Sequence, residues 1–216
     1  MKEYQNILFD MDGTLVDSEP GILESLRYTL DILKIKSCKD ETLQKFLGPP
    51  LKNSFQSYLH MNECEANEAV KIFRQYYSTK GMYKGKLYKN IVKVLEELYG
   101  KYDLFIATSK PTLYTVSIAK RLGISQYFEG IVGSNLDNSR SKKEEVIQYL
   151  LKEFSLKDKT KILMIGDKAQ DIVGARCCRI DAIGVSYGYG TIKELMEQKP
   201  LAILNMPEQL INFLEK

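Results

Sequence analysis

Short apolar runs separated by longer amphipathic stretches define the pattern of this chain. The runs have the length of buried strands, whereas the stretches between them place apolar residues three or four positions apart, which indicates helices. Strands that alternate with helices favour an α/β fold in which a parallel sheet carries helices on both faces, the doubly wound, Rossmann-like arrangement. The expected strands are 7–9, 104–107, 131–132, 162–165 and 182–185, with a last edge strand at 201–204.

The alternation is interrupted between residues 17 and 83, where helical patterns follow one another without a strand-like run. We therefore expect 1–16 to form the first strand and loop of the core, 17–83 an inserted all-helical cap, and 84–216 the rest of the core. An insert at this point can lie over the end of the sheet as a lid.

Composition narrows the class of protein. The chain has 216 residues, of which 44% are hydrophobic and 27% charged, and these values are typical of a globular protein. A formal charge of +3 is too small to argue for nucleic acid as a partner. No apolar run approaches the roughly 20 residues that span a bilayer, and no signal-like region precedes the first strand. We expect a cytoplasmic protein without a membrane partner, either a monomer or a homodimer.

Cysteine and histidine are too sparse for several kinds of site. The chain has four cysteines without CxxC spacing and a single histidine, His60. This argues against a zinc site and against Cys-His or Ser-His-Asp catalysis.

Two acids follow the first apolar run. Asp10 and Asp12 lie where this strand ends, and ligands of open α/β sheets bind beyond the carboxyl ends of the strands. Gly13 allows a sharp turn that leaves amide groups open to an anion, and Thr14 adds a hydroxyl donor. The group indicates a metal-and-phosphate site. The alternative is a surface Asp-Gly turn, which explains neither the buried run nor the second acid.

Three further polar groups occur at comparable places. Thr108 follows the run 104–107, and its hydroxyl, with the amides of Ser109 and Lys110, can bind phosphate oxygens. The alternative is that Thr108 and Ser109 only cap the next helix.

A pair of lysines, Lys142 and Lys143, opens a helix, where the helix dipole disfavours cations, so we expect an anion nearby. Asp167 and Asp171 follow the run 162–165 and lie one helical turn apart, on the same side. The alternative for this acidic pair is an N-capping Asp with an unrelated helical acid.

Together these motifs resemble the four signatures of the haloacid dehalogenase-like superfamily. Asp10-Met11-Asp12-Gly13-Thr14-Leu15 resembles the first signature, Thr108 the second, a lysine the third, and Gly166-Asp167-Lys168-Ala169-Gln170-Asp171 the fourth. For the third signature, the spacing to Val146-Ile147 favours Lys143 over Lys142. The family pattern often continues with prolines there, whereas this chain has Glu144-Glu145, which leaves the choice of lysine open.

The resemblance implies a set of roles. Asp10 is expected to be the nucleophile and Asp12 the general acid and base, while Thr108 and Lys143 bind the transferring group. Gly13, Thr14, Ser109 and Lys110 are expected to contact the substrate. The implied cofactor is Mg²⁺, with these expected ligands: Asp10, Asp12 through its backbone carbonyl, Asp167 and, directly or in support, Asp171.

The implied activity is that of a capped phosphatase similar to phosphoglycolate phosphatases and 5′-nucleotidases. We expect Mg²⁺-dependent hydrolysis of a small phosphorylated metabolite, phosphoglycolate- or nucleoside-monophosphate-like, through an aspartyl-phosphate. Lys52, after a stiff Gly-Pro-Pro turn, is expected to bind an anionic part of the substrate, the alternative being an exposed lysine.

Other chemistries of the superfamily stay open: a pyrophosphatase, a phosphonatase in which Lys52 forms a Schiff base with an aldehyde, a phosphomutase or a haloacid dehalogenase. Asp12 argues against the dehalogenase. A non-enzymatic phospho-acceptor module is the alternative of another class, although such modules are shorter and have no helical insert.

Overall fold

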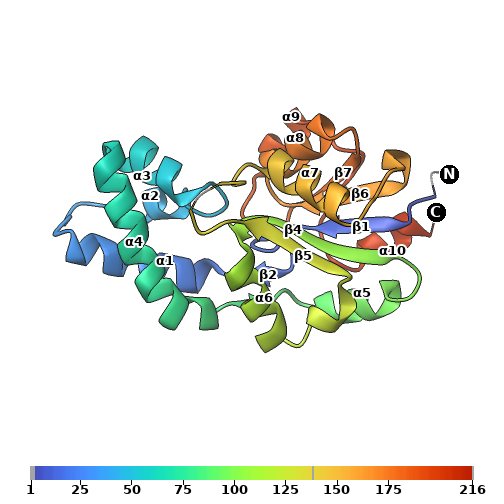
Figure 1. The fold of residues 1–216 in the computed structure, drawn as a ribbon, viewed down its shortest axis with the longest axis horizontal. Helices are drawn as coiled ribbons and strands as arrows, with labels where there is room; N and C mark the ends of the chain where they lie inside the picture. The colour runs from blue at the N-terminus through green and yellow to red at the C-terminus, as the bar shows by residue number, and fades with distance from the viewer. Residues whose placement is uncertain (1–2, 138, 216) are drawn as a thin grey trace. The chain divides into compact units, whose positions relative to one another are not determined.

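The computed structural model describes residues 3–137 and 139–215, and the chain divides into two compact units. One is formed by Met1–Val16 with Leu87–Lys216, the other by Asp17–Lys86 (Figure 1). The chain leaves and re-enters the first unit through β2 (Val16–Asp17) and β3 (Lys86–Leu87), which pair in a two-stranded sheet of their own.

A six-stranded sheet forms the centre of the first unit, in the order β5-β4-β1-β6-β7-β8, and each strand pairs in parallel with its neighbours. The prediction of a doubly wound α/β core with a helical insert is confirmed. The chain fills one half of the sheet from β1 outward and then returns to build the other half from β6. The point between β1 and β6 is therefore the topological switch point, where such sheets bind ligands. The strands are β1 (Asn6–Phe9), β4 (Asp103–Pro111), β5 (Gly130–Ser134), β6 (Ile162–Gly166), β7 (Asp181–Val185) and β8 (Ile203–Leu204).

Helices cover both faces of this sheet (Figure 1). One face carries α7 (Lys143–Glu153), α8 (Ala169–Cys177) and α9 (Ile192–Glu197). The other face carries α5 (Ile91–Leu98), α6 (Thr112–Arg121) and α10 (Gln209–Leu214). Short 3₁₀ turns, η2 (Ser125–Tyr127) and η3 (Lys159–Lys161), precede β5 and β6.

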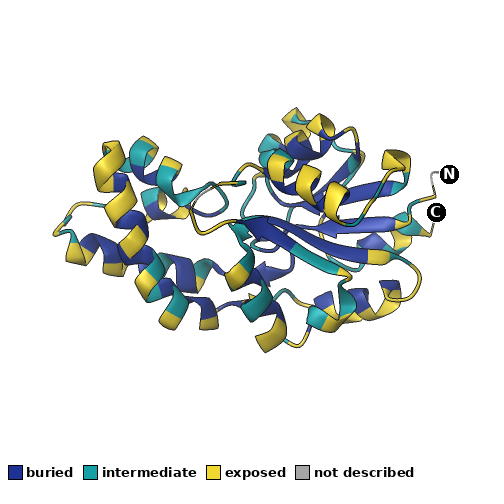
Figure 2. Ribbon diagram, viewed as in Figure 1, coloured by how far each residue is buried: buried dark blue, intermediate teal, exposed yellow. Residues whose placement is uncertain are grey.

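The strands are buried on both faces, which is why they are continuous apolar runs (Figure 2). On the face of α7 and α8, Leu8 lies in register with Phe105 and Met164, and all three belong to one buried cluster with Val146 and Ile172. Each such apolar side chain contributes roughly 1.5–3 kcal/mol on burial. The strand ends, and the residues that follow them, are therefore held firmly.

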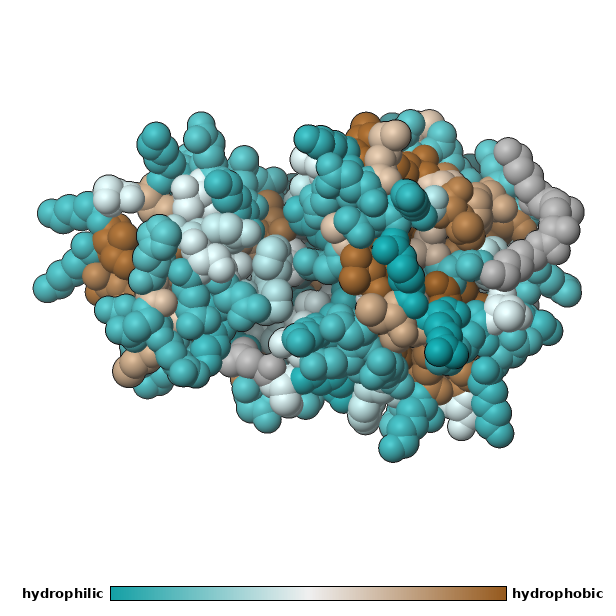
Figure 3. Space-filling view, turned by 90° about the horizontal axis from the view of Figure 1, so that it is seen from above, coloured by the Kyte–Doolittle hydropathy of each residue, from teal (hydrophilic) through white to brown (hydrophobic). Residues whose placement is uncertain are grey.

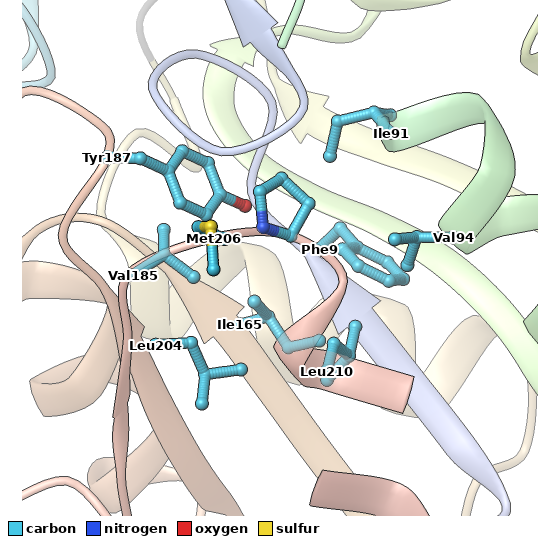
Figure 4. Close-up of a pocket in the computed structure, with 10 residues that line it drawn as sticks. Phe9, Ile91, Val94, Ile165, Val185, Tyr187, Leu204, Met206 and Leu210 are labelled. Carbon is cyan, nitrogen blue, oxygen red and sulfur yellow. The ribbon is translucent and has the colours of Figure 1, made fainter. Parts of the chain in front are cut away.

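The opposite face is packed just as closely (Figure 4). Phe9 and Ile165 from the two central strands lie among side chains of α5, α10 and the loop after β7, such as Val94, Leu210 and Tyr187. The remaining space is only ≈ 10 Å³, about the volume that a single water needs. The ends of β1 and β6 are therefore closely packed on this face as well.

The second unit consists of α1 (Glu19–Ile32), α2 (Asp40–Gln44), α3 (Leu51–Leu59), α4 (Glu63–Thr79) and the turn η1 (Gly81–Tyr83). A Cβ at Gly21 would lie 2.0 Å from the carbonyl oxygen of Gly81, so a glycine is needed where α1 meets η1. Phe46 and Phe55 pack edge to face, and a capping box of Asn62 and Glu65 begins α4.

Hydrophilic side chains cover most of the molecular face drawn in Figure 3, and apolar side chains gather only in smaller patches. Within the described ranges, none of the helices combines the length and the apolar character needed to cross a membrane.

Candidate active site

Three buried carboxylates meet at the switch point of the sheet. Asp10 directly follows β1, Asp167 directly follows β6, and Asp171 lies in the first turn of α8. One oxygen from each lies within 4.8 Å of the others. The register explains this, since Phe9 and Ile165 are paired and the amide of Asp10 donates to the Ile165 carbonyl at 2.9 Å.

A buried lysine lies within this cluster. The Lys143 ammonium is 2.8 Å from Oδ1 of Asp10 and 2.7 Å from Oδ1 of Asp171, and it donates to the carbonyl of Ala107 at 3.1 Å. Burial opposes its charge, but the two carboxylates outweigh this effect and raise the pKa of Lys143. Lys142, in contrast, is exposed. Of the two lysines that the sequence left open, the structure brings Lys143 to the carboxylates.

The charges of the cluster do not balance. Burial, followed by the neighbouring carboxylates, raises the pKa of Asp167, and burial also raises the pKa of Asp171 against the opposing charge of Lys143. With Asp10 included, three carboxylates and one ammonium leave a formal charge of −2 when all are ionised. Oxygen ligands and two missing positive charges fit a hard divalent cation such as Mg²⁺.

The hydrogen bonding of the cluster agrees with this fit. Oδ1 of Asp10 and Oδ1 of Asp171 are buried without an aligned hydrogen-bond donor, although each contacts the Lys143 ammonium as an ion pair. Carboxylate oxygens in that position are able to accept a cation as a further partner.

Asp12 is paired with a second lysine. The Lys110 ammonium lies 2.7 Å from Oδ2 and 3.0 Å from Oδ1 of Asp12. The amide of Lys110 donates to Oγ1 of Thr108 at 3.3 Å. This differs from the expectation that the Lys110 amide is open to a phosphate. Thr108 itself is buried at the end of the sheet, and Ser109 is half-buried.

The loop after Asp12 supports Asp167. Gly13 has φ +84°, and a Cβ there would lie 2.2 Å from Oδ2 of Asp167, so only glycine fits. Thr14 is fully buried, and its hydroxyl donates to Oδ1 of Asp167 at 3.2 Å. The Thr14 hydroxyl, which we expect to contact a substrate, supports this carboxylate in the structure.

A segment that sequence reasoning missed completes the support. In the loop after β7, the amide of Tyr189 donates to Oδ2 of Asp167 at 2.8 Å, and the phenol of Tyr187 donates to the Thr14 carbonyl at 3.1 Å. A Cβ at Gly190 would lie 1.8 Å from the Asp167 carbonyl oxygen. The two glycines that alternate with tyrosines just after a strand, Gly188 and Gly190, were the available signal.

Lys52 belongs to the other unit. It lies on α3, where its ammonium is 2.7 Å from a carboxylate oxygen of Glu63 and its side chain is 26% exposed. Its charge is therefore already compensated within the helical unit.

Comparison with known proteins gives the family. A model of the haloacid dehalogenase-like hydrolases matches residues 7–185. A protein of Pseudomonas aeruginosa named 5′-nucleotidase is 38% identical over 198 residues, 91% of this chain and 89% of that protein. A protein of Mycobacterium tuberculosis named tyrosine-protein kinase PtkA is 32% identical over 86% of this chain and 63% of its own length.

Among solved structures, the crystal structure of a "predicted phosphatase" from Clostridium acetobutylicum is 38% identical. It covers 99% of this chain and 100% of its own, with a TM-score of 0.94. The four sequence motifs, the fold and the matched family model agree, and the chain therefore belongs to the haloacid dehalogenase-like hydrolases.

Proposed function

We propose that this hydrolase is a Mg²⁺-dependent phosphatase that cleaves a small phosphorylated metabolite through an aspartyl-phosphate on Asp10. The observation that carries the proposal is the buried cluster of Asp10, Asp167 and Asp171 around Lys143, with its deficit of two positive charges. Asp10 and Asp167, directly or with support from Asp171, would hold the cation together with the Asp12 carbonyl.

Charge repulsion explains why such a cluster suits a phosphatase. Two unit negative charges at 4 Å repel by roughly 4 kcal/mol at an effective dielectric of 20, and a phosphate dianion repels a carboxylate more strongly. Bound Mg²⁺ supplies positive charge that offsets this repulsion and stabilises the phosphoryl oxygens. Lys143 adds an ammonium on the same side, in contact with Asp10.

In the first step, a carboxylate oxygen of Asp10 forms a bond to phosphorus while the bond from phosphorus to the ester oxygen breaks. Asp12 gives its proton to the leaving oxygen, so the alcohol departs neutral. Thr108 and Lys143 bind the other phosphoryl oxygens. In the second step, water attacks phosphorus and gives a proton to Asp12; the bond to Asp10 breaks, and phosphate leaves.

We propose further that the helical unit acts as the cap that selects the substrate. The support is its position in the chain, since it is inserted directly after the loop that carries Asp10 and Asp12. Lys52 is the proposed contact for an anionic part of the substrate. If so, Lys52→Met should raise KM for substrates with a second anionic group and leave KM for p-nitrophenyl phosphate unchanged.

The substrate class is proposed to be phosphoglycolate- or nucleoside-monophosphate-like. The name of the Pseudomonas aeruginosa relative supports the second of these. A panel of phosphoglycolate, nucleoside monophosphates and pyrophosphate, ranked by kcat/KM, would decide between them. A pyrophosphate preference would contradict the proposed class.

The reaction itself is tested with p-nitrophenyl phosphate and Asp10→Asn. We expect repeated release of inorganic phosphate that stops on chelation and returns with Mg²⁺, together with an acid-stable phosphoenzyme that Asp10→Asn cannot form. Glu97→Gln, which removes an exposed carboxylate on α5, is the control. Full turnover by Asp10→Asn, or transfer of the phosphoryl group to a protein tyrosine instead of water, would overturn the proposal.

A further inference from the structure

The ion pair between Lys110 and Asp12 is almost closed to solvent. Its two N···O distances are 2.7 and 3.0 Å, and the side chains are 6% and 15% exposed. An exposed ion pair typically contributes little, because water screens it and two long side chains must be ordered. Here the ammonium contacts both carboxylate oxygens with little solvent between them, so it restricts the orientation of the Asp12 carboxylate.

The backbone explains why Lys110 reaches this acid. Ala107 of β4 pairs with Val132 of β5, but the next pairing joins Pro111 to Ser134, so the register shifts between them. Such irregularities re-aim side chains at the ends of strands, often beside active sites. Thr108 and Lys110 lie in the same irregular segment and are linked by the hydrogen bond from the Lys110 amide to Oγ1 of Thr108.

The two buried lysines contact different acids. Lys143 contacts Asp10 and Asp171, the groups assigned to attack and to the cation. Lys110 contacts Asp12, the group assigned to proton transfer. The two ammonium groups therefore contact different carboxylates of the proposed machinery.

We propose that Lys110 is a positioning residue that orients Asp12 for proton transfer to the leaving oxygen, an inference that rests on the proposed phosphatase activity. Lys110 exchanges no proton itself. In the step that it supports, Asp12 has taken up a proton from solvent on one oxygen and keeps the other oxygen on the Lys110 ammonium. That proton passes to the ester oxygen as the bond from that oxygen to phosphorus breaks and the bond from Asp10 forms, which leaves Asp12 as the carboxylate of the ion pair. A lysine that only stabilised the loop, or that bound the substrate, would act on all leaving groups alike or through KM.

The leaving group provides the test. Phenyl phosphate releases a basic oxygen that needs protonation, whereas p-nitrophenyl phosphate releases a weakly basic one that can leave as the phenolate anion. The two esters are similar in size, and neither carries a second anionic group. We expect Lys110→Met, which keeps an unbranched stem, to lower kcat for phenyl phosphate at least roughly tenfold more than kcat for p-nitrophenyl phosphate. Asp12→Asn should likewise lower kcat for phenyl phosphate more than kcat for p-nitrophenyl phosphate. The double variant of Lys110→Met and Asp12→Asn should lose no more kcat than Asp12→Asn alone.

Equal losses of kcat for both esters would overturn the proposal in favour of a structural role. A change confined to KM, and larger for substrates with a second anionic group, would overturn it in favour of substrate binding. Lys101→Met, which removes an exposed ammonium 3.9 Å from Glu97, is the matched control. It should leave kcat and KM for both esters unchanged.

A variant that does not fold and a protein without phosphatase activity have different consequences for the proposal. If Lys110→Met does not fold, as judged by circular dichroism, Lys110→Arg keeps the proposal testable, because it retains the charge and should retain most of the selectivity for phenyl phosphate. A folded Lys110→Arg that loses as much kcat for phenyl phosphate as Asp12→Asn does would overturn the proposal, and so would unchanged kinetics of a folded Lys110→Gln. If the unmodified protein releases no phosphate from either ester, the proposed function fails, and this inference fails with it.

Discussion

Gly174 of α8 lies directly against the stem of Lys143. A Cβ at position 174 would come within 2.8 Å of Cγ and 2.9 Å of Cβ of this lysine. The position of the buried ammonium therefore depends on the absence of a side chain on the neighbouring helix. This contact involves no polar atom of the proposed chemistry.

Gly174→Ala should lower activity through this contact alone. Overfilling a packed site typically costs 1–3 kcal/mol, and here the strain acts on the stem that positions the ammonium beside Asp10. We expect a clear loss of kcat with p-nitrophenyl phosphate and a lower melting temperature. Gly184→Ala is the matched control, because its Cβ would come no closer than 3.2 Å, to the flexible Cδ1 of Leu195. Equal activity of the two variants would contradict the prediction.

Removal of the Lys143 ammonium should lower the free energy of unfolding more than Gly174→Ala does. Lys143→Met leaves Asp10 and Asp171 buried without their cation, and breaking a buried ion pair in this way typically costs 3–5 kcal/mol. We expect a fall in unfolding free energy of about this size, measured by urea denaturation in chelator, together with loss of turnover. Lys142→Met, at the adjacent exposed position, should change the free energy by less than about 0.5 kcal/mol. The reverse order of the two variants would show that the wrong lysine had been chosen.

Stability without metal should fall as the pH rises. The pKa values of Asp167 and Asp171 are raised above the ordinary 3.8, chiefly by burial, so these carboxyls release protons on unfolding. Their stabilising contribution is thus complete below pH 3.8 and lost as the pH rises through the raised values. Bound Mg²⁺ should reverse this loss, because it favours the ionised carboxylates of the folded state.

Circular dichroism is the suitable probe, because the chain has no tryptophan. We expect the rise in melting temperature on adding Mg²⁺ to grow between pH 5 and pH 8. In Asp167→Asn, the dependence on pH and the effect of Mg²⁺ should both be smaller. A stabilisation by Mg²⁺ that is independent of pH would contradict the assignment.

The loop after β7 should contribute both to the free energy of unfolding and to the affinity for Mg²⁺. Tyr187→Phe removes the donor to the Thr14 carbonyl, which we expect to lower the unfolding free energy by about 1 kcal/mol. Because Thr14 also donates to Asp167, the affinity for Mg²⁺ should fall as well. Tyr83→Phe, at a tyrosine that is 54% exposed, is the control, and calorimetric titration with Mg²⁺ is the measurement. Unchanged affinity in Tyr187→Phe would show that the loop does not support the carboxylate.

The sequence predicted the residues that strands deliver. Asp10 and Asp167 each follow an apolar run, and parallel strands end at one edge of a sheet, so the meeting of these two carboxylates follows from the hydrophobic pattern. The ammonium of Lys110 could not be placed in this way, since its direction depends on a shift of register within β4. The hydrogen bond from Thr14 to Asp167 could not be predicted either, since it joins the loop after β1 to a residue from a strand distant in the sequence.

Short elements were missed for another reason. β2 and β3 have two residues each, too few for an alternating pattern, and α9 has six. The loop of Tyr187 and Gly190 carries no charged side chain, and its direct contacts with Asp167 are a backbone amide and the close approach of glycines. Backbone contacts of that kind leave only glycines as a trace in the sequence.

The central place of β1 has a consequence for biosynthesis. Asn6 pairs with Asp103 on one side and with Ile162 on the other, so β1 leaves the ribosome before both of its partners and stays unenclosed until β4 and β6 have been made. Pairings between such distant segments slow folding and leave an apolar segment open to aggregation meanwhile. The Asp10 carboxylate is therefore made early and its surroundings late, and its buried cluster with Asp167 and Asp171 cannot assemble until β6 and α8 have been translated.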